Sequence, residues 1–279
     1  MKVFVTGATG FIGSAVVREL VKAGHQVTGL TRSEKGIELL KKMGANAHPG
    51  SLEDPDSLRS GAAAADGVIH MAFKHEENLA NFDAALKIDL RAVETLGAAL
   101  EGSGKPFVIT NHRNGEQSEK AAFALAGVRT SMANLAPTVH GEGDHGFMPA
   151  LINIARTKGV SAYVGDGSNR WPAVHRLDAA NLFRLALEKA PAGSRLIGRA
   201  EEGVPFIEIA IAIGKQLNLP VVSITREEAD AHFGFLGTLA ALDITSMIPA
   251  SSTRTRELLG WQPVHPTLIE DLEQGHYFK

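Results

Sequence analysis

Short apolar runs alternate with helical repeats through the first half of the chain. Branched and aromatic residues fill the runs, as in Val3-Phe4-Val5, and this composition favours strands. Between the first two runs, Ile12, Val16 and Leu20 recur at the spacing of one helix face. The pattern predicts strands over 2–6, 26–31, 45–48, 68–71, 107–110 and 128–135, with helices between them that include 79–100 and 118–125.

Helices that alternate with apolar strands imply a parallel sheet covered on both faces. Because crossovers are right-handed, a doubly wound α/β sheet, the Rossmann arrangement, is the simplest topology. After Pro137 the pattern loosens, and helices are predicted over 147–158, 178–189, 205–217 and 227–241. We therefore expect an amino-terminal domain over residues 1–140 and a smaller lobe over 141–279, some segments of which return to the sheet.

The composition excludes several classes of protein. The chain is an ordinary globular mixture, with 44% hydrophobic and 21% charged residues. Its net charge of −3 lacks the basic surplus of a duplex-binding protein, so no nucleic-acid partner is expected. No apolar run reaches the roughly 18 residues that cross a bilayer, so no membrane partner is expected. Cysteine is absent, which excludes a thiolate nucleophile and a cysteine-type zinc site and fits a cytoplasmic protein.

A glycine-rich turn follows the first predicted strand and opens the first predicted helix. Gly7 permits a tight turn, Gly10 lets the backbone approach a pyrophosphate, and Gly13 lets the helix pack close to the strand. Free amides at the helix start favour phosphate charge. The turn therefore predicts a dinucleotide-binding domain, and a structural turn without a ligand is the alternative. The predicted cofactor contacts are Gly7, Ala8, Thr9, Gly10, Phe11, Ile12 and Gly13.

The end of the second predicted strand indicates which dinucleotide binds. NAD sites usually carry Asp or Glu about 20 residues after the glycines, where it holds both ribose hydroxyls. This chain has Arg32 at that place, and no carboxylate precedes it there. A guanidinium pairs with a 2′-phosphate, and Ser33 adds a hydroxyl. We therefore expect NADP(H) rather than NAD(H), with a solvated surface role for Arg32 as the alternative.

Several segments together resemble the extended short-chain dehydrogenase/reductase superfamily, of the NAD-dependent epimerase/dehydratase type. They are TGATGFIG at 6–13, VIHMAF at 68–73, LAPTVHG at 135–141, VGDGSNRWPAVH at 164–175 and LGWQP at 259–263. The resemblance covers nearly the whole chain. It implies a Rossmann domain with a small carboxyl-terminal substrate lobe, a nicotinamide cofactor, and a homodimer formed through the helices at 79–100 and 118–125.

The resemblance also implies roles for single positions. The implied cofactor contacts are Ser51 and Leu52 near the adenine, Ala72 and Phe73 along the adenosine and ribose, and Pro137, Thr138 and Val139 beside the nicotinamide. Ser51 stands where the family often has Asp. The implied substrate contacts are Trp171, His175 and Arg176, with core or capping roles as the alternative.

The usual proton-transfer residues of this family are missing. Its members use a Tyr, with a Lys four residues later, to exchange a proton with the substrate oxygen, because a free Tyr with a pKa of about 10 needs a neighbouring cation. A Ser or Thr at the end of the fifth strand holds that oxygen. In the best register, Gly115 and Glu119 occupy the Tyr and Lys positions, and Lys120 is one residue off. Thr110 matches the Ser/Thr position, so it is both a catalytic and a cofactor-site candidate.

The proton donor is therefore unassigned, and histidines are candidates. His112 and Arg113 lie in the connection 111–117, which is much shorter than usual in the family; a solvated pair is the alternative. His140 is a catalytic candidate because the family often places Tyr or His there, facing the nicotinamide, although a structural His that closes a turn explains it as well. The residues around His140 and His145 match no ligand motif, so no metal is predicted.

These features favour an NADP(H)-dependent oxidoreductase that acts on a small carbonyl or alcohol substrate. A non-catalytic NADP(H)-binding sensor or partner-binding protein is a second hypothesis, because the Tyr/Lys pair is absent. A nucleotide-sugar epimerase or dehydratase is a third, and it requires a basic diphosphate site. Arg156, Arg170 and Arg176 are the residues that could build such a site.

Overall fold

The computed structural model describes residues 1–74, 82–110, 114–247 and 251–279. The chain divides into two compact units. Unit 1 comprises residues 1–134, 179–196 and 254–261, and unit 2 comprises residues 135–178, 197–253 and 262–279. Two segments from the second half of the chain thus belong to the unit that contains the amino terminus.

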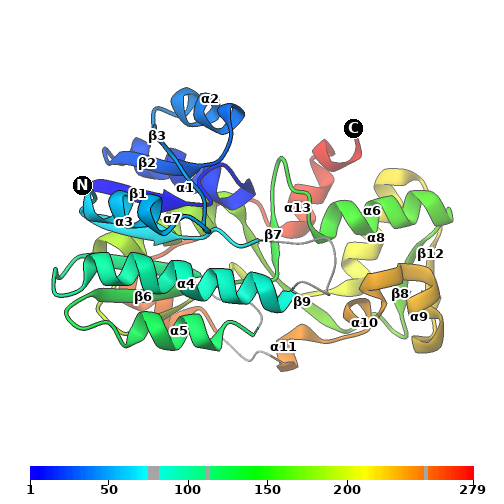
Figure 1. Ribbon diagram of the computed structural model, residues 1–279. Helices are drawn as coiled ribbons and strands as arrows, with labels where there is room; N and C mark the ends of the chain where they lie inside the picture. The colour runs from blue at the N-terminus through cyan, green and yellow to red at the C-terminus, as the bar shows by residue number, and fades with distance from the viewer. Residues whose placement is uncertain (75–81, 111–113, 248–250) are drawn as a thin grey trace. The chain divides into compact units, whose positions relative to one another are not determined.

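Unit 1 carries a seven-stranded sheet in the order β10-β6-β5-β4-β1-β2-β3 (Figure 1). Its strands are β1 (Lys2–Thr6), β2 (Gln26–Thr31), β3 (Asn46–Pro49), β4 (Gly67–His70), β5 (Pro106–Thr110), β6 (Arg129–Leu135) and β10 (Ser194–Gly198). All neighbouring pairs from β3 to β6 are parallel. This order confirms the doubly wound α/β fold predicted from the sequence.

Helices cover both faces of this sheet (Figure 1). They are α1 (Phe11–Lys22), α2 (Glu34–Lys42), α3 (Pro55–Ala63), α4 (Phe82–Leu100), α5 (Glu116–Phe123), α7 (Arg176–Lys189) and α12 (Thr253–Leu259). On one face, α1 and α7 are joined by Arg184, whose Nε donates to Glu19 Oε1 at 2.7 Å. On the other face, α3, α4 and α5 bury an apolar cluster that includes Phe4, Leu96 and Phe107. Burial of these apolar stripes is the main force that holds the helices on the sheet.

Unit 2 contains two small sheets and its own core. The sheets are β11-β9-β7 and β12-β8. Their strands are β7 (Thr138–His140), β8 (Ser161–Val164), β9 (Arg170–His175), β11 (Glu201–Pro205) and β12 (Val221–Ile224). The helices are α6 (Phe147–Lys158), α8 (Phe206–Leu217), α9 (Arg226–Phe233), η2 (Gly234–Leu236), α10 (Gly237–Ala240), α11 (Ile244–Met247), α13 (Leu268–Glu273) and η3 (His276–Phe278). Trp171 is completely buried at the centre, with its ring centroid 5.1 Å from that of Phe206.

Most predicted elements of the second half are confirmed, and one is wrong. The helix predicted over 147–158 has the same bounds in the structure, and that over 205–217 begins one residue later. The single helix predicted over 227–241 is interrupted, because Gly234 adopts φ +58° and ends α9. Part of the helix predicted over 79–100 lies outside the described residues. Among the described residues, no helix combines the length and apolar character needed to cross a bilayer.

Candidate functional site

The glycine turn between β1 and α1 is a tight cradle of backbone. Gly7 adopts φ +71°, and a Cβ there would lie 2.9 Å from the amide nitrogen of Ala72. A Cβ on Gly13 would lie only 1.9 Å from the carbonyl oxygen of Gly7. The amide of Gly10 donates to the same carbonyl at 3.0 Å. Side chains larger than hydrogen therefore do not fit at positions 7 and 13.

The start of α1 is suited to a phosphate group. Its N-cap residue, Gly10, has no side chain to bond the first-turn amides, and the first turn contains no acidic residue. Uncapped amides and the positive end of the helix macrodipole favour a bound anion. The residues of the turn thus fit the pyrophosphate of a dinucleotide, both sterically and electrostatically.

Arg32 follows β2 at the same end of the sheet as the glycine turn. Its side chain is exposed. The neighbouring Ser33 is the N-cap of α2, where its hydroxyl oxygen accepts from the Gly36 amide at 3.2 Å. A Cβ on Gly36 would come within 1.9 Å of the Thr31 hydroxyl oxygen, so the backbone packs closely at this helix start. Arg32 and Ser33, the residues predicted to select NADP(H) over NAD(H), are therefore adjacent at the N-terminus of α2.

The other predicted cofactor residues fall at neighbouring strand ends of unit 1 or in unit 2. Ser51 and Leu52 follow β3, Ala72 and Phe73 follow β4, and Thr110 ends β5. In a parallel sheet these carboxyl ends share one edge with the glycine turn. In unit 2, Pro137 is exposed, Val139 is half-buried and Thr138 is buried. The Thr138 hydroxyl oxygen has no hydrogen-bond partner among the described residues.

A buried chain of hydrogen bonds connects the residue before the glycine turn to the end of β4. Thr6, immediately before the turn, accepts from the amides of Met71 and Ala72 at 3.3 and 3.2 Å. Its oxygen lies 2.7 Å from His70 Nδ1. Because two amides already donate to this oxygen, the hydroxyl hydrogen is directed to His70 Nδ1. The chain thus ties the end of β1 to the end of β4.

The same chain continues into α4 and α5. Since His70 Nδ1 accepts, its Nε2 carries the proton and donates to Asp89 Oδ1 at 3.2 Å. Ser118 donates to Asp89 Oδ2 at 2.6 Å. These side chains are all buried. Sequence analysis missed this network, although a histidine in an apolar strand and an aspartate on an apolar helix face were visible signals.

The residues that stand at the expected Tyr and Lys positions lie at the start of α5. Gly115 is the N-cap of α5, and Glu119 forms an ion pair with Arg195 at 2.7 Å. Ser118 is turned into the core, whereas Lys120 is exposed. His112 and Arg113, the candidates in the short connection, lie outside the described residues.

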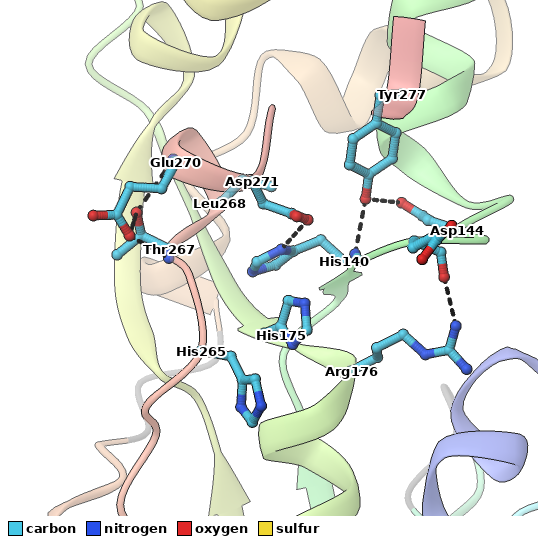
Figure 2. Close-up of polar contacts among 12 residues, drawn as sticks. His140, Asp144, His175, Arg176, His265, Thr267, Leu268, Glu270, Asp271 and Tyr277 are labelled. Carbon is cyan, nitrogen blue, oxygen red and sulfur yellow. Dashed lines mark hydrogen bonds and ion pairs between the residues drawn. The ribbon is translucent and has the colours of Figure 1, made fainter. Parts of the chain in front are cut away.

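In unit 2, His140 is held in the interior by the carboxyl-terminal segment. Its Nδ1 donates to Asp271 Oδ2 on α13 at 2.8 Å, and the ring is completely buried (Figure 2). The hydroxyl of Tyr277 accepts from the Gly141 amide and donates to Asp144, both at 3.0 Å. Burial and the adjacent Asp144 raise the pKa of Tyr277 above its ordinary range. This arrangement favours the structural alternative for His140.

The predicted substrate contacts differ in their surroundings. Trp171 lies in the core, where its indole nitrogen donates to the Leu239 carbonyl at 3.2 Å; this burial favours the core role over the implied substrate contact. Arg176 donates to the Glu142 carbonyl. His175 is nearly buried, and its ring stacks on that of His265 with centroids 5.0 Å apart (Figure 2).

Asp178 completes a group of metal-capable side chains with His175 and His265. Their ligand atoms lie within 4.8 Å of one another. The two imidazole planes, however, are within 11° of parallel. Imidazole lone pairs lie in the ring plane, so two stacked rings do not direct them to one ion. In this arrangement the group is a hydrogen-bonded stack rather than a metal centre.

Comparison with known proteins identifies relatives over the full length. Residues 3–110 match the NAD dependent epimerase/dehydratase family. An uncharacterized protein of Schizosaccharomyces pombe is 47% identical and is covered completely, as is this chain. The 2-alkyl-3-oxoalkanoate reductase of Stenotrophomonas maltophilia is 29% identical over 72% of this chain and 69% of its own length.

A solved structure shows the same fold. The dTDP-glucose 4,6-dehydratase DesIV of Streptomyces venezuelae, as a double mutant with NAD bound, has a TM-score of 0.77 and 17% identity. The match covers 99% of this chain and 96% of that one. The alignment with the S. pombe protein spans 301 positions against the 279 residues of this chain. At least 22 residues of that relative therefore stand opposite gaps in the alignment and have no counterpart in this chain.

Proposed function

Because this chain belongs to the NAD-dependent epimerase/dehydratase family, we propose that it is an NADP(H)-dependent oxidoreductase acting on a small carbonyl or alcohol substrate. The family and its named relatives mark the chain as an NAD(P)-dependent enzyme of the oxidoreductase, epimerase or dehydratase type. The comparisons thereby favour an enzyme over the non-catalytic sensor.

The observation that carries the choice of NADP(H) is Arg32 at the end of β2. The side chain is exposed, and no hydrogen bond or ion pair to it occurs among the described residues. A guanidinium in that position is available for a 2′-phosphate, whereas a site for the unphosphorylated ribose calls for a carboxylate. Ser33 presents its hydroxyl beside it.

The chain's own residues would bind and orient the dinucleotide. The glycine turn and the amides at the start of α1 would hold the pyrophosphate, and Arg32 with Ser33 would hold the 2′-phosphate. When bound, NADPH supplies the hydride for carbonyl reduction. The buried Thr6–His70–Asp89 chain would keep the ends of β1 and β4 in register beneath it.

The contacts of the three arginines that could bind a diphosphate favour a reductase over a nucleotide-sugar enzyme. Arg156 donates to the Phe278 carbonyl, Arg170 pairs with Asp243, and Arg176 donates to the Glu142 carbonyl. Each is engaged with the chain itself. A relative with 29% identity is a reductase of 2-alkyl-3-oxoalkanoates, which supports a small oxo compound as the substrate class.

Calorimetric titration with NADPH and NADH tests the cofactor. Hydrogen bonds to charged groups contribute about 1.5–3 kcal/mol, and exposure places Arg32 at the low end of this range. We expect Arg32→Ala to weaken NADPH binding roughly tenfold and to leave NADH binding unchanged. Arg18→Ala, an exposed arginine on α1, is the matched control. Equal affinity of the wild type for both dinucleotides would contradict the proposal.

Turnover is tested by following NADPH absorbance with aliphatic aldehydes, ketones and 3-oxo esters. We expect oxidation of NADPH with at least one of these compounds. A parallel assay with UDP- and dTDP-sugars separates the reductase from the nucleotide-sugar enzyme. Conversion of a nucleotide sugar, with no oxidation of NADPH by any carbonyl compound, would overturn the substrate class.

A further inference from the structure

A small pocket lies in unit 1, beside the first residues of β10. Its lining comes from residues 193–196 and from α12, and the lining residues all belong to unit 1. The pocket has a volume of about 170 Å³. This is several times the roughly 30 Å³ that one water molecule occupies in the liquid, and less than the ~300–1,000 Å³ of sites for drug-sized ligands. The pocket therefore suits a small ion or a small metabolite.

This pocket is separate from the glycine turn. The amide of Gly193, just before β10, donates to the carbonyl oxygen of Thr130 at 2.9 Å, and Thr130 is the second residue of β6. The pocket thus lies next to the start of β6. Strands β1, β4, β5 and β6 are parallel neighbours, so their starts share the edge of the sheet opposite to the glycine turn. A dinucleotide at the carboxyl ends of the strands would leave this pocket open.

Two arginines line the pocket, and none of the described residues that line it is acidic. Arg195 comes from β10 and Arg254 from α12. A guanidinium stays charged at any physiological pH, and its planar fork of N–H donors matches two oxygens of a phosphate or carboxylate. Two such forks, supplied by different elements to one small pocket, form a donor set for an oxyanion.

Arg195 is held in position by α5. Its Nε donates to Glu119 Oε1 at 2.7 Å, and its Nη2 lies 2.7 Å from the same oxygen. The guanidinium carbon also lies 4.3 Å from the centre of the Phe123 ring, a stacked contact that favours a guanidinium. Among the described residues, Glu119 is the one that bonds to this side chain. The guanidinium is therefore fixed before a ligand arrives, which lowers the entropy cost of binding.

Arg254 brings a positive charge that the chain does not balance. Its side chain is exposed, and no described residue forms a hydrogen bond or ion pair with it. The other arginine of α12, Arg256, lies over the Trp261 ring, 5.6 Å from its centre. Glu119 balances the charge of Arg195, so the charge of Arg254 remains. A surplus positive charge at a pocket favours an anion there.

We propose that this pocket binds a phosphate group, held between the guanidinium groups of Arg195 and Arg254. A phosphomonoester carries a charge of about −1.5 to −2 near pH 7, whereas a carboxylate carries a single charge, so phosphate is the better match for two guanidinium groups. Leu196 and Leu258 also line the pocket, and they offer apolar contact to a small carbon skeleton on the phosphate. The ligand is inorganic phosphate or a small phosphomonoester. This inference does not depend on the dinucleotide proposed for the glycine turn.

NMR titration of the full ¹⁵N-labelled chain with inorganic phosphate tests the site. The amides of Leu196 and Thr255 report on the pocket, and the amide of Gly10 reports on the glycine turn, so each place gives its own Kd. Ionic strength is held constant, because salt screens surface charges. We expect saturable shifts of the Leu196 and Thr255 signals. Unchanged positions of both signals at millimolar phosphate would overturn the proposal.

Arg254→Gln removes the unbalanced charge. Hydrogen bonds to charged groups are among the stronger ones, and exposure weakens them, so we expect the Kd at the pocket to rise about tenfold. The Kd measured at Gly10 should not change. The urea midpoint should also keep its wild-type value, because no described residue bonds to this side chain. A wild-type Kd at the pocket in Arg254→Gln would overturn the assignment.

Arg18→Gln is the matched control, because it removes an equal charge from an exposed position on α1 of the same unit. It should leave the Kd at the pocket unchanged. An equal loss of affinity in Arg18→Gln and Arg254→Gln would overturn the proposal, since binding would then follow the overall charge rather than the pocket.

Titrations with acetate and ethyl phosphate identify the ligand class. We expect acetate to bind more weakly than phosphate, because it carries one charge. Acetate binding as tight as that of phosphate would overturn the assignment of a phosphate site. Tighter binding of ethyl phosphate than of inorganic phosphate would support a phosphomonoester as the ligand, and weaker binding would support the free ion.

Discussion

The buried Thr6–His70–Asp89 chain allows a quantitative test of what stabilises unit 1. His70→Leu keeps a similar volume but removes the bridge between the other two groups. It removes the acceptor of the Thr6 hydroxyl hydrogen at 2.7 Å and one donor to Asp89 Oδ1 at 3.2 Å. An unsatisfied buried group costs about 1–3 kcal/mol, and more when it is charged. We therefore expect a loss of about 3–5 kcal/mol in the free energy of unfolding, a large share of a typical domain's stability.

Urea denaturation followed by far-UV circular dichroism measures this loss. Ser118→Ala is the companion variant, because it removes a different donor, at 2.6 Å, from the same carboxylate. Its expected cost is about 1.5–3 kcal/mol. Since both changes act on Asp89, the double variant should depart from additivity by at least about 0.5 kcal/mol. A cost below about 1 kcal/mol for His70→Leu, or strict additivity, would refute the hydrogen-bond assignment.

Three further outcomes are expected. Gly13→Ala should abolish NADPH binding in calorimetry, because its Cβ would lie 1.9 Å from the Gly7 carbonyl oxygen and must displace the turn; undiminished affinity would contradict this. Tyr277→Phe should lower the unfolding free energy by about 1–3 kcal/mol, since Asp144 loses its hydroxyl donor, and an unchanged urea midpoint would argue against it. Burial lowers the pKa of His175 to about 4 from 6.5, so the unfolded chain binds more protons between these pH values. Stability should therefore fall by up to about 3 kcal/mol as the pH is lowered across this window, and urea titrations should show a weaker fall in His175→Gln.

The sheet and the cofactor turn were predictable because their signals are local. Alternation of apolar runs and helical repeats specifies a parallel sheet, and three glycines within seven residues specify the turn after its first strand. The prediction of a single helix over 227–241 was wrong for an equally local reason. Gly234 lies inside a helical repeat, and its φ of +58° ends the helix there. A glycine within a repeat leaves open whether the helix continues or stops.

The polar networks were not predictable because their partners are distant in the sequence. His140 and Asp271 are 131 residues apart, and Asp178 and His265 are 87 residues apart. No periodicity links such positions, so only the tertiary fold brings them together. Trp171 illustrates the same limit, because a motif places the residue in a segment but does not decide whether its ring faces a pocket or the core.

The residues expected to bind the dinucleotide are close together in the sequence, whereas residues that transfer a proton can be far apart in it. The proposed phosphate binding depends on backbone conformation at positions 7–13, so it is expected to survive changes elsewhere in the sequence. Proton transfer requires two or three side chains at fixed distances, and this chain has Gly115 and Glu119 where the resemblance implies a Tyr and a Lys. A chain that keeps the glycine turn and lacks the Tyr/Lys pair is expected to bind the dinucleotide, while its turnover depends on another acid.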